Sequence, residues 1–381
     1  LSTFYALFVG RQRRGLLPLD ENLKGSGVPY IPHDRIPTHL PHGVESMNWL
    51  DPKGLWQYKW SLHSAGHASL DLTKDLYREG MFRDRNRESS WLLGDSGGFQ
   101  IGKGKWEGDW RAGSGCEKAQ KKRDGVLRWM DKFMDYGMIL DIPAWVDRSP
   151  EGSAASKISS YQEAVDGTRY NNEYFMKHRD GSCKFLNVLQ GENFAQADDW
   201  YEQMKDFCDP VKYPETHFNG WAMGGQNMCD IHLALKRVVT LMRDGLLEKG
   251  KHDVMHFLGT SKLEWAMVLT AIQRGVRKSH NENFTVTFDC ASPFLATSNG
   301  TQYTGYRLEH EGKWSYMMES APDDKALHMD TTPFDQYCAP LYDNWMTSPM
   351  SQGLKLNDVT VYGPNDVNRM GQSNATSWDS F

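Results

Sequence analysis

Between residues 60 and 295 the chain alternates short apolar runs with segments of helical pattern. The runs lack a regular polar and apolar alternation, which is typical of strands buried on both faces of a parallel sheet. The well-marked strand candidates are Trp91–Leu93, Met138–Ile142, Lys184–Leu189, Gly220–Met223, Val254–Leu258 and Phe284–Phe288. Trp60–His63 is an earlier candidate, and Val28–Ile31 is a weaker one.

Apolar residues between these runs recur three and four positions apart, as on one face of an amphipathic helix. The clearest helical patterns lie within residues 126–134, 231–246 and 263–272. Strand and helix repeat about eight times, which predicts an α/β fold, the (β/α)8 TIM barrel, with insertions. Because the first two strands are weakly marked, a doubly wound open sheet is the alternative.

The last part of the chain does not continue this alternation and is rich in Asp, Asn, Ser and Pro. We therefore expect a catalytic barrel over residues 1–300 and an irregular C-terminal extension over residues 301–381, packed on the barrel. A length of 381 residues suffices for one large barrel or two ordinary domains.

The apolar runs and the cysteines indicate in which compartment the protein is expected. No apolar run approaches the roughly 20 residues that span a bilayer, so we expect no membrane association. The apolar start LSTFYALFVG precedes its arginines, the reverse of the order in a secretory signal. The six cysteines include no pair at C-x-x-C spacing, which argues against a zinc ribbon and a disulfide scaffold. A reducing cytoplasm and no bound metal are the expectation.

Polar residues and glycines follow the carboxyl ends of the predicted strands, and in a barrel these ends meet at one mouth. The residues in question are Asp95, Asp141, Gln190, Gly224, Gly225, Gly259 and Asp289. Two aspartates in one pocket suggest a nucleophile and an acid/base group, as in retaining glycosidases. A single aspartate at a strand end often only caps a helix, and Asp95 before Ser-Gly-Gly fits a turn. Three such aspartates together favour a catalytic pocket.

The remaining polar groups at this mouth fit a purine. Asp141 can accept two hydrogen bonds from adjacent N–H donors, as on a guanine edge. Gln190 and the backbone N–H of Gly225 can donate to a carbonyl such as guanine O6. Phe99 offers a flat face for stacking.

The segment DSGGFQ at Asp95–Gln100 resembles the signature of queuine-type tRNA-guanine transglycosylases. The resemblance continues in order through LDIP, VLQG, GWAMGG, HFLG and FDC, and it covers roughly residues 90 to 300. It implies a barrel enzyme that replaces guanine in a polynucleotide with a free 7-deazaguanine base and needs no cofactor. A base inside a duplex cannot reach such a pocket, so the target nucleotide must flip out or be single-stranded.

The resemblance also implies residue roles. Asp289 corresponds to the nucleophile that attacks C1′ of the sugar, and Asp95 to the general acid/base. The residues that correspond to base contacts are Ser96, Phe99, Asp141, Gln190, Gly224, Gly225 and Leu258.

Two departures from the tRNA enzymes point to a different polymer. Those enzymes bind zinc through a C-x-C-x-x-C run and a later His, whereas this chain has only Cys338 after Cys290. They also carry two arginines between FDC and NG, where residues 291–298 contain none. A chain that keeps the catalytic motifs but lacks the zinc ligands and the two arginines resembles the DNA-guanine transglycosylases of bacteria and phages. The products of those enzymes can shield DNA from restriction nucleases. We expect DNA and a free base such as 7-cyano-7-deazaguanine as partners.

Three other functions stay open at this point. They are a tRNA enzyme that reads its substrate by other means, a non-catalytic nucleic-acid-binding subunit, and a glycoside hydrolase on a similar barrel. The net charge of −6 is mild evidence against nucleic-acid binding, so local basic patches must supply the affinity.

Basic and aromatic residues that directly follow the DSGGFQ segment are the candidate nucleic-acid contacts. They are Lys103, Lys105, Trp106 and Arg111. The alternative is that Trp106 and Trp110 pack against the barrel wall. His63 and His67 in HSAGH have metal-ligand spacing without a third ligand, so a hydrogen-bonded or packing role is favoured.

Overall fold

The computed structural model describes residues 6–9, 50, 52–53, 57–68, 70–73, 85–260, 262–290, 292, 301–308, 314–320, 330–333, 336 and 355. Contacts divide the chain into two compact units. One unit comprises residues 1–9, 60–75 and 91–290, and the other comprises residues 10–59, 76–90 and 291–381.

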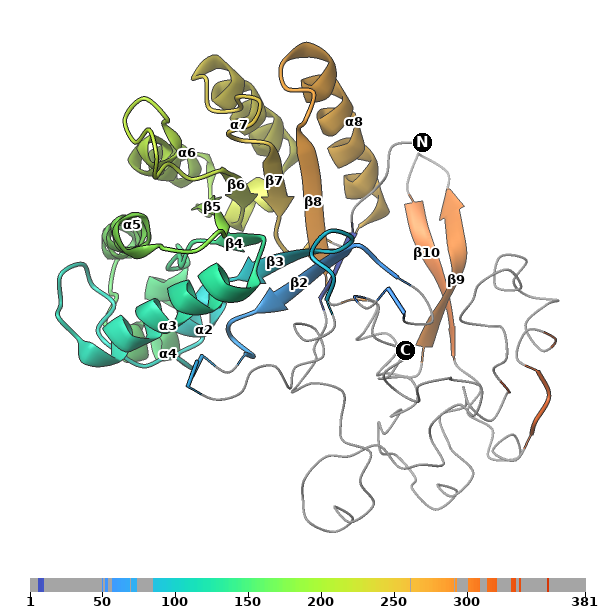
Figure 1. Cartoon of the computed structure of the whole chain (residues 1–381), viewed down its shortest axis with the longest axis horizontal. Helices are drawn as coiled ribbons and strands as arrows, with labels where there is room; N and C mark the ends of the chain where they lie inside the picture. The colour runs from blue at the N-terminus through green and yellow to red at the C-terminus, as the bar shows by residue number, and fades with distance from the viewer. Residues whose placement is uncertain are drawn as a thin grey trace, which may run out of the picture. The chain divides into compact units, whose positions relative to one another are not determined.

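The first unit is a closed barrel of parallel strands that follow one another in sequence order (Figure 1). The strands are β1 Ala6–Val9, β2 Trp60–Ser64, β3 Trp91–Asp95, β4 Tyr136–Met138, β5 Lys184–Leu189, β6 Gly220–Met223, β7 Val254–Phe257 and β8 Thr285–Cys290. The pairing of β1 with β8, which sets Leu7 against Asp289, closes the ring. The predicted (β/α)8 barrel is therefore confirmed, and the open sheet is excluded.

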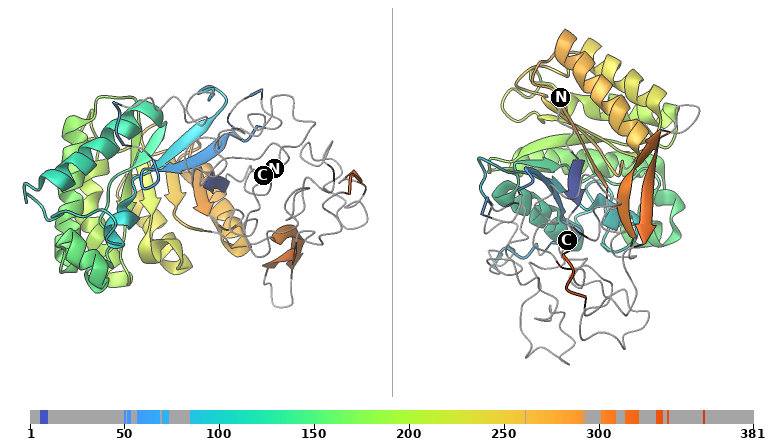
Figure 2. Two further views of the ribbon diagram at one scale, coloured as in Figure 1. Left: turned by 90° about the horizontal axis from the view of Figure 1, so that it is seen from below. Right: turned by 90° about the vertical axis from the view of Figure 1, so that its right-hand side faces the viewer.

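Helices lie on the outside of these strands (Figures 1 and 2). They are α2 Gly98–Gly102, α3 Glu117–Phe133, α4 Pro150–Ser156, α5 Tyr161–His178, α6 Phe194–Met204, α7 Ile231–Arg243 and α8 Leu263–Ser279, with the 3-10 turns η5 Val146–Arg148, η6 Lys205–Cys208 and η7 Gly225–Met228. Among the helices that the structure describes, none is both long and apolar enough to cross a bilayer.

Local sequence explains where these helices begin. Ser160 accepts a hydrogen bond from the N–H of Glu163 and so caps α5. Asn193 caps α6 in the same way, and Asp230 accepts from two N–H groups at the start of α7. The apolar faces of the helices bury large side chains against the strands, including the fully buried Trp129 and Trp200.

Two strand predictions require correction, and the bounds of β2, β3, β7 and β8 differ from the predicted ones by one or two residues. The first barrel strand is Ala6–Val9, whereas the weaker candidate Val28–Ile31 lies outside the described residues. β4 ends at Met138 instead of continuing to Ile142. The N–H of Asp141 bonds to the carbonyl of Ile139 at 3.0 Å, and this tight turn takes the chain out of the sheet. The predicted β5 and β6 match the observed bounds.

The second unit contains a two-stranded antiparallel sheet formed by β9 Thr301–Leu308 and β10 Trp314–Ser320. Its register shifts between Met317 and Met318, as at a β-bulge. These strands fall within the region that we expect to be irregular.

Candidate functional site

The predicted site residues come from the carboxyl ends of successive strands. Asp95 is the last residue of β3, and Asp289 is the penultimate residue of β8. Asp141, Gln190 and Leu258 follow β4, β5 and β7, and Gly224 and Gly225 follow β6. Burial is the main cause of the raised pKa values of Asp95 and Asp141, and the charge of Asp289 adds to the first and the charge of Asp95 to the second. The three carboxyl groups are therefore close enough to interact electrostatically at one mouth of the barrel.

Asp95 has the environment of a proton donor. Burial raises the pKa of Asp95 above its ordinary value, and the neighbouring Asp289 charge acts in the same direction. Hydrogen bonds oppose this shift: the Ser64 hydroxyl donates to Oδ2 at 2.5 Å, and the Gly97 N–H donates to Oδ1 at 3.3 Å. The net effect is a raised pKa, which suits a general acid.

Asp289 instead has donors directed at its carboxylate. His256 Nε2 and the Gly259 N–H each lie 3.0 Å from Oδ1 of Asp289. The Asp289 side chain is 14% exposed, so it is not completely shielded from solvent. Gly259 has φ +65°, a conformation that favours glycine, and this allows its N–H to face the carboxylate.

Asp141 and Gln190 are joined to each other. Gln190 Nε2 donates to Oδ2 of Asp141 at 2.8 Å. Burial raises the pKa of Asp141 to about 7, the Gln190 hydrogen bond lowers it, and the Asp95 charge raises it. Asp141 is 7% exposed, and a Cβ at Gly98 would lie 2.4 Å from its carbonyl oxygen. Only glycine therefore lets α2 approach Asp141 this closely.

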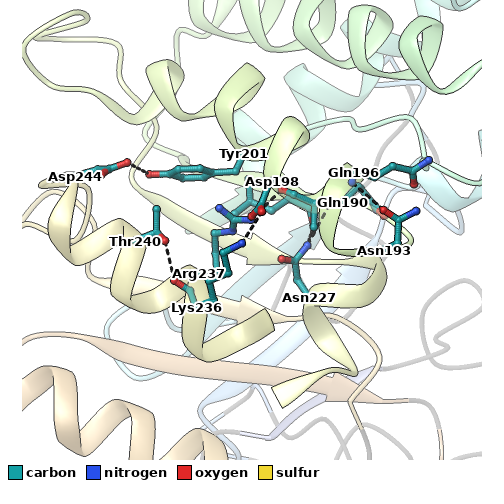
Figure 3. A network of polar contacts seen from close by, with 12 residues as sticks. Gln190, Asn193, Gln196, Asp198, Tyr201, Asn227, Lys236, Arg237, Thr240 and Asp244 are labelled. Carbon is teal, nitrogen blue, oxygen red and sulfur yellow. Dashed lines mark hydrogen bonds and ion pairs between the residues drawn. The ribbon is translucent and has the colours of Figure 1, made fainter. Parts of the chain in front are cut away.

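The turns after β5 and β6 are tied together around Gln190. The Gln226 N–H donates to the carbonyl of Gly191 at 2.7 Å, and Asn227 Nδ2 donates to the carbonyl of Gln190 at 3.1 Å (Figure 3). Gly225 has φ +55°, and a Cβ there would lie 2.4 Å from the Gly191 carbonyl oxygen. Both turns are thus held in one arrangement.

The same network continues into the helices behind these turns. Arg237 of α7 is almost fully buried and donates to the carbonyl of Ala197 at 2.9 Å and to Asp198 Oδ1 at 2.8 Å (Figure 3). Ala197 packs against Gly191, where a Cβ would meet the Ala197 nitrogen at 2.5 Å. The buried cation therefore supports the Gln190–Gly191 turn from outside the barrel.

The predicted stacking residues differ in exposure. Phe99 of α2 is 57% exposed, and its ring meets Trp145 edge-on at 5.8 Å between centroids. Leu258 is partly exposed, and its N–H donates to the carbonyl of Met223 at 3.1 Å. Ser96 is buried, and its Oγ accepts a long 3.4 Å hydrogen bond from the Gly98 N–H.

The candidate nucleic-acid contacts differ in exposure and in their partners. Lys103 and Lys105 are exposed, and the Lys103 ammonium lies 5.4 Å from the Phe99 ring centroid. The Arg111 guanidinium is held by Asp109 in two hydrogen bonds of 2.9 and 2.6 Å, so its charge is partly neutralised.

Trp106 and Trp110 are packed. Trp106 lies so close to Gly97 that a Cβ there would be 2.7 Å from its ring. Trp110 is completely buried, and its Nε1 donates to the carbonyl of Trp106 at 3.0 Å. This geometry favours the packing alternative for both rings.

The two HSAGH histidines differ in burial. His63 is buried with its ring 5.6 Å from that of Trp129, and His67 is exposed. Over the part of the chain that the structure describes, no group of three or more His, Cys, Asp or Glu side chains is placed to bind a metal.

Three site residues were not predicted from the sequence: Ser64, His256 and Thr287. Ser64 ends β2, His256 is the one polar residue of β7, and Thr287 is a fully buried threonine of β8, a strand that also contains Thr285 and Asp289. A polar side chain inside a buried strand needs a partner, so this interruption of the apolar pattern was the available signal.

A comparison with models of known protein families gives no match to this chain, and a comparison with curated protein sequences gives none either.

Proposed function

We propose that this protein is a pentosyltransferase of the guanine transglycosylase type, which exchanges guanine in DNA for a free 7-deazaguanine base. The main support is the pairing of two unlike carboxyl groups at one mouth. Asp95 has a raised pKa, and Asp289 has its carboxylate fixed by two hydrogen-bond donors. To displace a leaving group from an anomeric carbon, an enzyme needs a nucleophile that attacks the carbon and an acid that protonates the leaving group.

In the first displacement, an oxygen of Asp289 donates an electron pair to C1′ of the deoxyribose. The bond between C1′ and N9 of guanine breaks, and its electrons go to the base. Asp95 gives its proton to a ring nitrogen of the departing guanine. The products are free guanine, a glycosyl ester on Asp289 and a carboxylate at Asp95.

The second displacement reverses these roles. Asp95 takes the N9 proton of the incoming 7-deazaguanine, whose N9 electrons form a bond with C1′. The ester bond breaks, the carboxylate of Asp289 returns, and Asp95 is protonated again. The number of glycosidic bonds is unchanged, so the exchange requires neither ATP nor a redox cofactor.

The other residues at the mouth fit the recognition of a purine edge. The Asp141 carboxylate matches the adjacent N1–H and N2–H donors of guanine, and the second N–H of the Gln190 amide can reach a carbonyl. Gly225 is the first residue of the turn η7, so its N–H is not needed for a hydrogen bond within that turn. The exposed ring of Phe99 is available to stack on a base.

The choice of DNA over tRNA depends on the sequence between Asp289 and Gly300. Residues 291–298 lack the two arginines with which tRNA enzymes of this type read the anticodon loop. Modification of this kind would serve to protect DNA from restriction nucleases.

The deciding experiment mixes the protein with labelled guanine and with either DNA or tRNA, and follows label entering each polymer. We expect incorporation into DNA and a covalent protein–DNA adduct that survives denaturation. Asp289→Asn should abolish both, while Asp166→Asn, an exposed aspartate on α5, should leave both intact. Incorporation into tRNA alone would contradict the choice of DNA. Full exchange by Asp289→Asn would contradict the mechanism.

A further inference from the structure

The two oxygens of the Asp289 carboxylate are in different environments. Oδ1 faces both His256 Nε2 and the Gly259 N–H. In the part of the chain that the structure describes, the hydrogen bonds of this carboxylate all go to Oδ1. Oδ2 therefore keeps its lone pairs for another atom.

We propose that His256 is a positioning residue, which Thr287 holds in place and which makes Oδ2 the oxygen of Asp289 that attacks C1′. This inference rests on the proposed exchange reaction, because it assigns one step of that reaction to one atom. It adds to that reaction a role for two residues, His256 and Thr287, that touch neither the base nor the sugar.

The barrel register explains why these three side chains meet. His256 of β7 stands directly opposite Thr287 of β8. Asp289 lies two residues after Thr287, and residues two apart on a strand point to the same side. The ring of His256 thus lies across both β8 side chains, with Nδ1 2.9 Å from Thr287 Oγ1 and Nε2 3.0 Å from Asp289 Oδ1.

Burial and hydrogen bonding also fix the role of the ring. His256 and Thr287 are both fully buried, so the ring cannot turn to water. A carboxylate oxygen accepts hydrogen bonds and does not donate them, so Nε2 carries the proton that faces Oδ1. In the tautomer with its single proton on Nε2, Nδ1 is an acceptor, and the Thr287 hydroxyl can donate to it.

This arrangement acts on both displacements. Two donors withdraw electron density from Oδ1, so the pair that forms the bond to C1′ comes from Oδ2, and Oδ1 becomes the carbonyl oxygen of the ester. When the incoming base displaces the ester, the C1′–Oδ2 bond breaks and its electrons return to the carboxylate. The same two donors then stabilise the returning negative charge.

A pair of amide substitutions isolates the Nε2 donor. The side-chain amide of His256→Gln can place an N–H near the position of Nε2, whereas that of His256→Asn is too short and reaches only the Nδ1 position. We expect His256→Asn to reduce kcat for base exchange by about 10- to 100-fold, the usual effect of losing a hydrogen bond to a charged group. The KM for the free base should change by less than about 3-fold, because the base touches neither residue. His256→Gln should restore kcat to within about 5-fold of the parent value.

Thr287→Val provides a second route that leaves the histidine in place. It removes the hydroxyl that holds Nδ1 and keeps a β-branched side chain. We expect a smaller loss of kcat than in His256→Asn, again without a change in the KM for the base. Melting temperatures of all variants show whether each is folded, and Thr287→Val tests the inference if His256→Asn does not fold.

The outcomes separate this inference from the proposed function. A parent protein that forms no adduct and exchanges no base would overturn the proposed function. An active parent together with unchanged kcat in His256→Asn and Thr287→Val would overturn only the role of His256. Equal losses of kcat and base affinity in the Gln and Asn variants would also overturn it, because a purely structural histidine predicts that result. A structure of the trapped adduct should show C1′ bonded to the oxygen that faces away from His256.

Discussion

The hydroxyl of Ser64 donates a hydrogen bond of 2.5 Å to Oδ2 of Asp95, across the adjacent strands β2 and β3. Ser64 and Asp95 are register partners at the last position of each strand, so the sheet itself sets this contact. The hydrogen bond favours the charged carboxylate and lowers a pKa that burial raises. Ser64 therefore adjusts how readily Asp95 gives up its proton.

Removing this hydroxyl should move the pH dependence of adduct formation. In Ser64→Ala the pKa of Asp95 rises further, because the carboxylate loses a donor while its burial is unchanged. Asp95 must be protonated in the first displacement, so the rate of adduct formation falls as pH rises through this pKa. We expect that decline to occur at higher pH in Ser64→Ala, measured as single-turnover adduct formation against pH. Ser64→Thr keeps the hydroxyl and should follow the parent. A decline at unchanged or lower pH would contradict the role of Ser64.

The affinity for the free base should depend on Asp141. Its carboxylate form accepts both N–H donors of a guanine edge, and its pKa is about 7. Binding of 7-cyano-7-deazaguanine should therefore strengthen as pH rises through about 7, measured by calorimetric titration at several pH values. Asp141→Asn should bind at least about 10-fold more weakly above that pH and lose the dependence, since an amide presents a donor where the base also has one. Equal affinity of parent and variant at high pH would exclude Asp141 from base recognition.

The same carboxyl group should affect folding stability in the opposite direction. The folded pKa of Asp141, about 7, lies above its ordinary value of 3.8. Between these two values the folded protein binds a proton that the unfolded chain does not, so stability is highest below this window and is lost as pH rises through about 7. The raised pKa of Asp95 adds to the same trend. We expect the melting temperature of the parent to fall across this range and that of Asp141→Asn to fall less. Identical pH dependence in both proteins would show that Asp141 is not buried as described.

The barrel and the approximate places of β2 to β8 were predictable from local pattern. β5 and β6 are mainly apolar runs followed by Gln190 and Gly224, so their ends are visible in the sequence. The strand Ala6–Val9 was not predicted, because its place depends on pairing with β8 at the other end of the barrel. Such a pairing depends on residues far apart in the chain and leaves no local signal.

The same limit applies within the site. The positions of Asp95, Asp141 and Asp289 follow from the rule that strand ends converge at one mouth. The contact between His256 and Asp289 depends on the register between β7 and β8. The convergence of strand ends does not predict that register. The hydrogen bond between Gln190 and Asp141 was also missed, because side-chain direction after a strand is decided by the turn.

Two glycines should respond oppositely to alanine. A Cβ at Gly98 would lie 2.4 Å from the carbonyl oxygen of Asp141 and 2.9 Å from its Oδ1, so α2 must move away from the site. We expect Gly98→Ala to lose about 1–3 kcal/mol of unfolding free energy and most of its base affinity. A Cβ at Gly275 on α8 meets nothing within 4 Å, and alanine stabilises a helix interior by about 0.5–1 kcal/mol relative to glycine. Gly275→Ala should therefore unfold at higher denaturant concentration with unchanged base affinity. Chemical denaturation and base titration of both variants test this, and a Gly98→Ala protein with full base affinity would show that the close approach of α2 to Asp141 is not required.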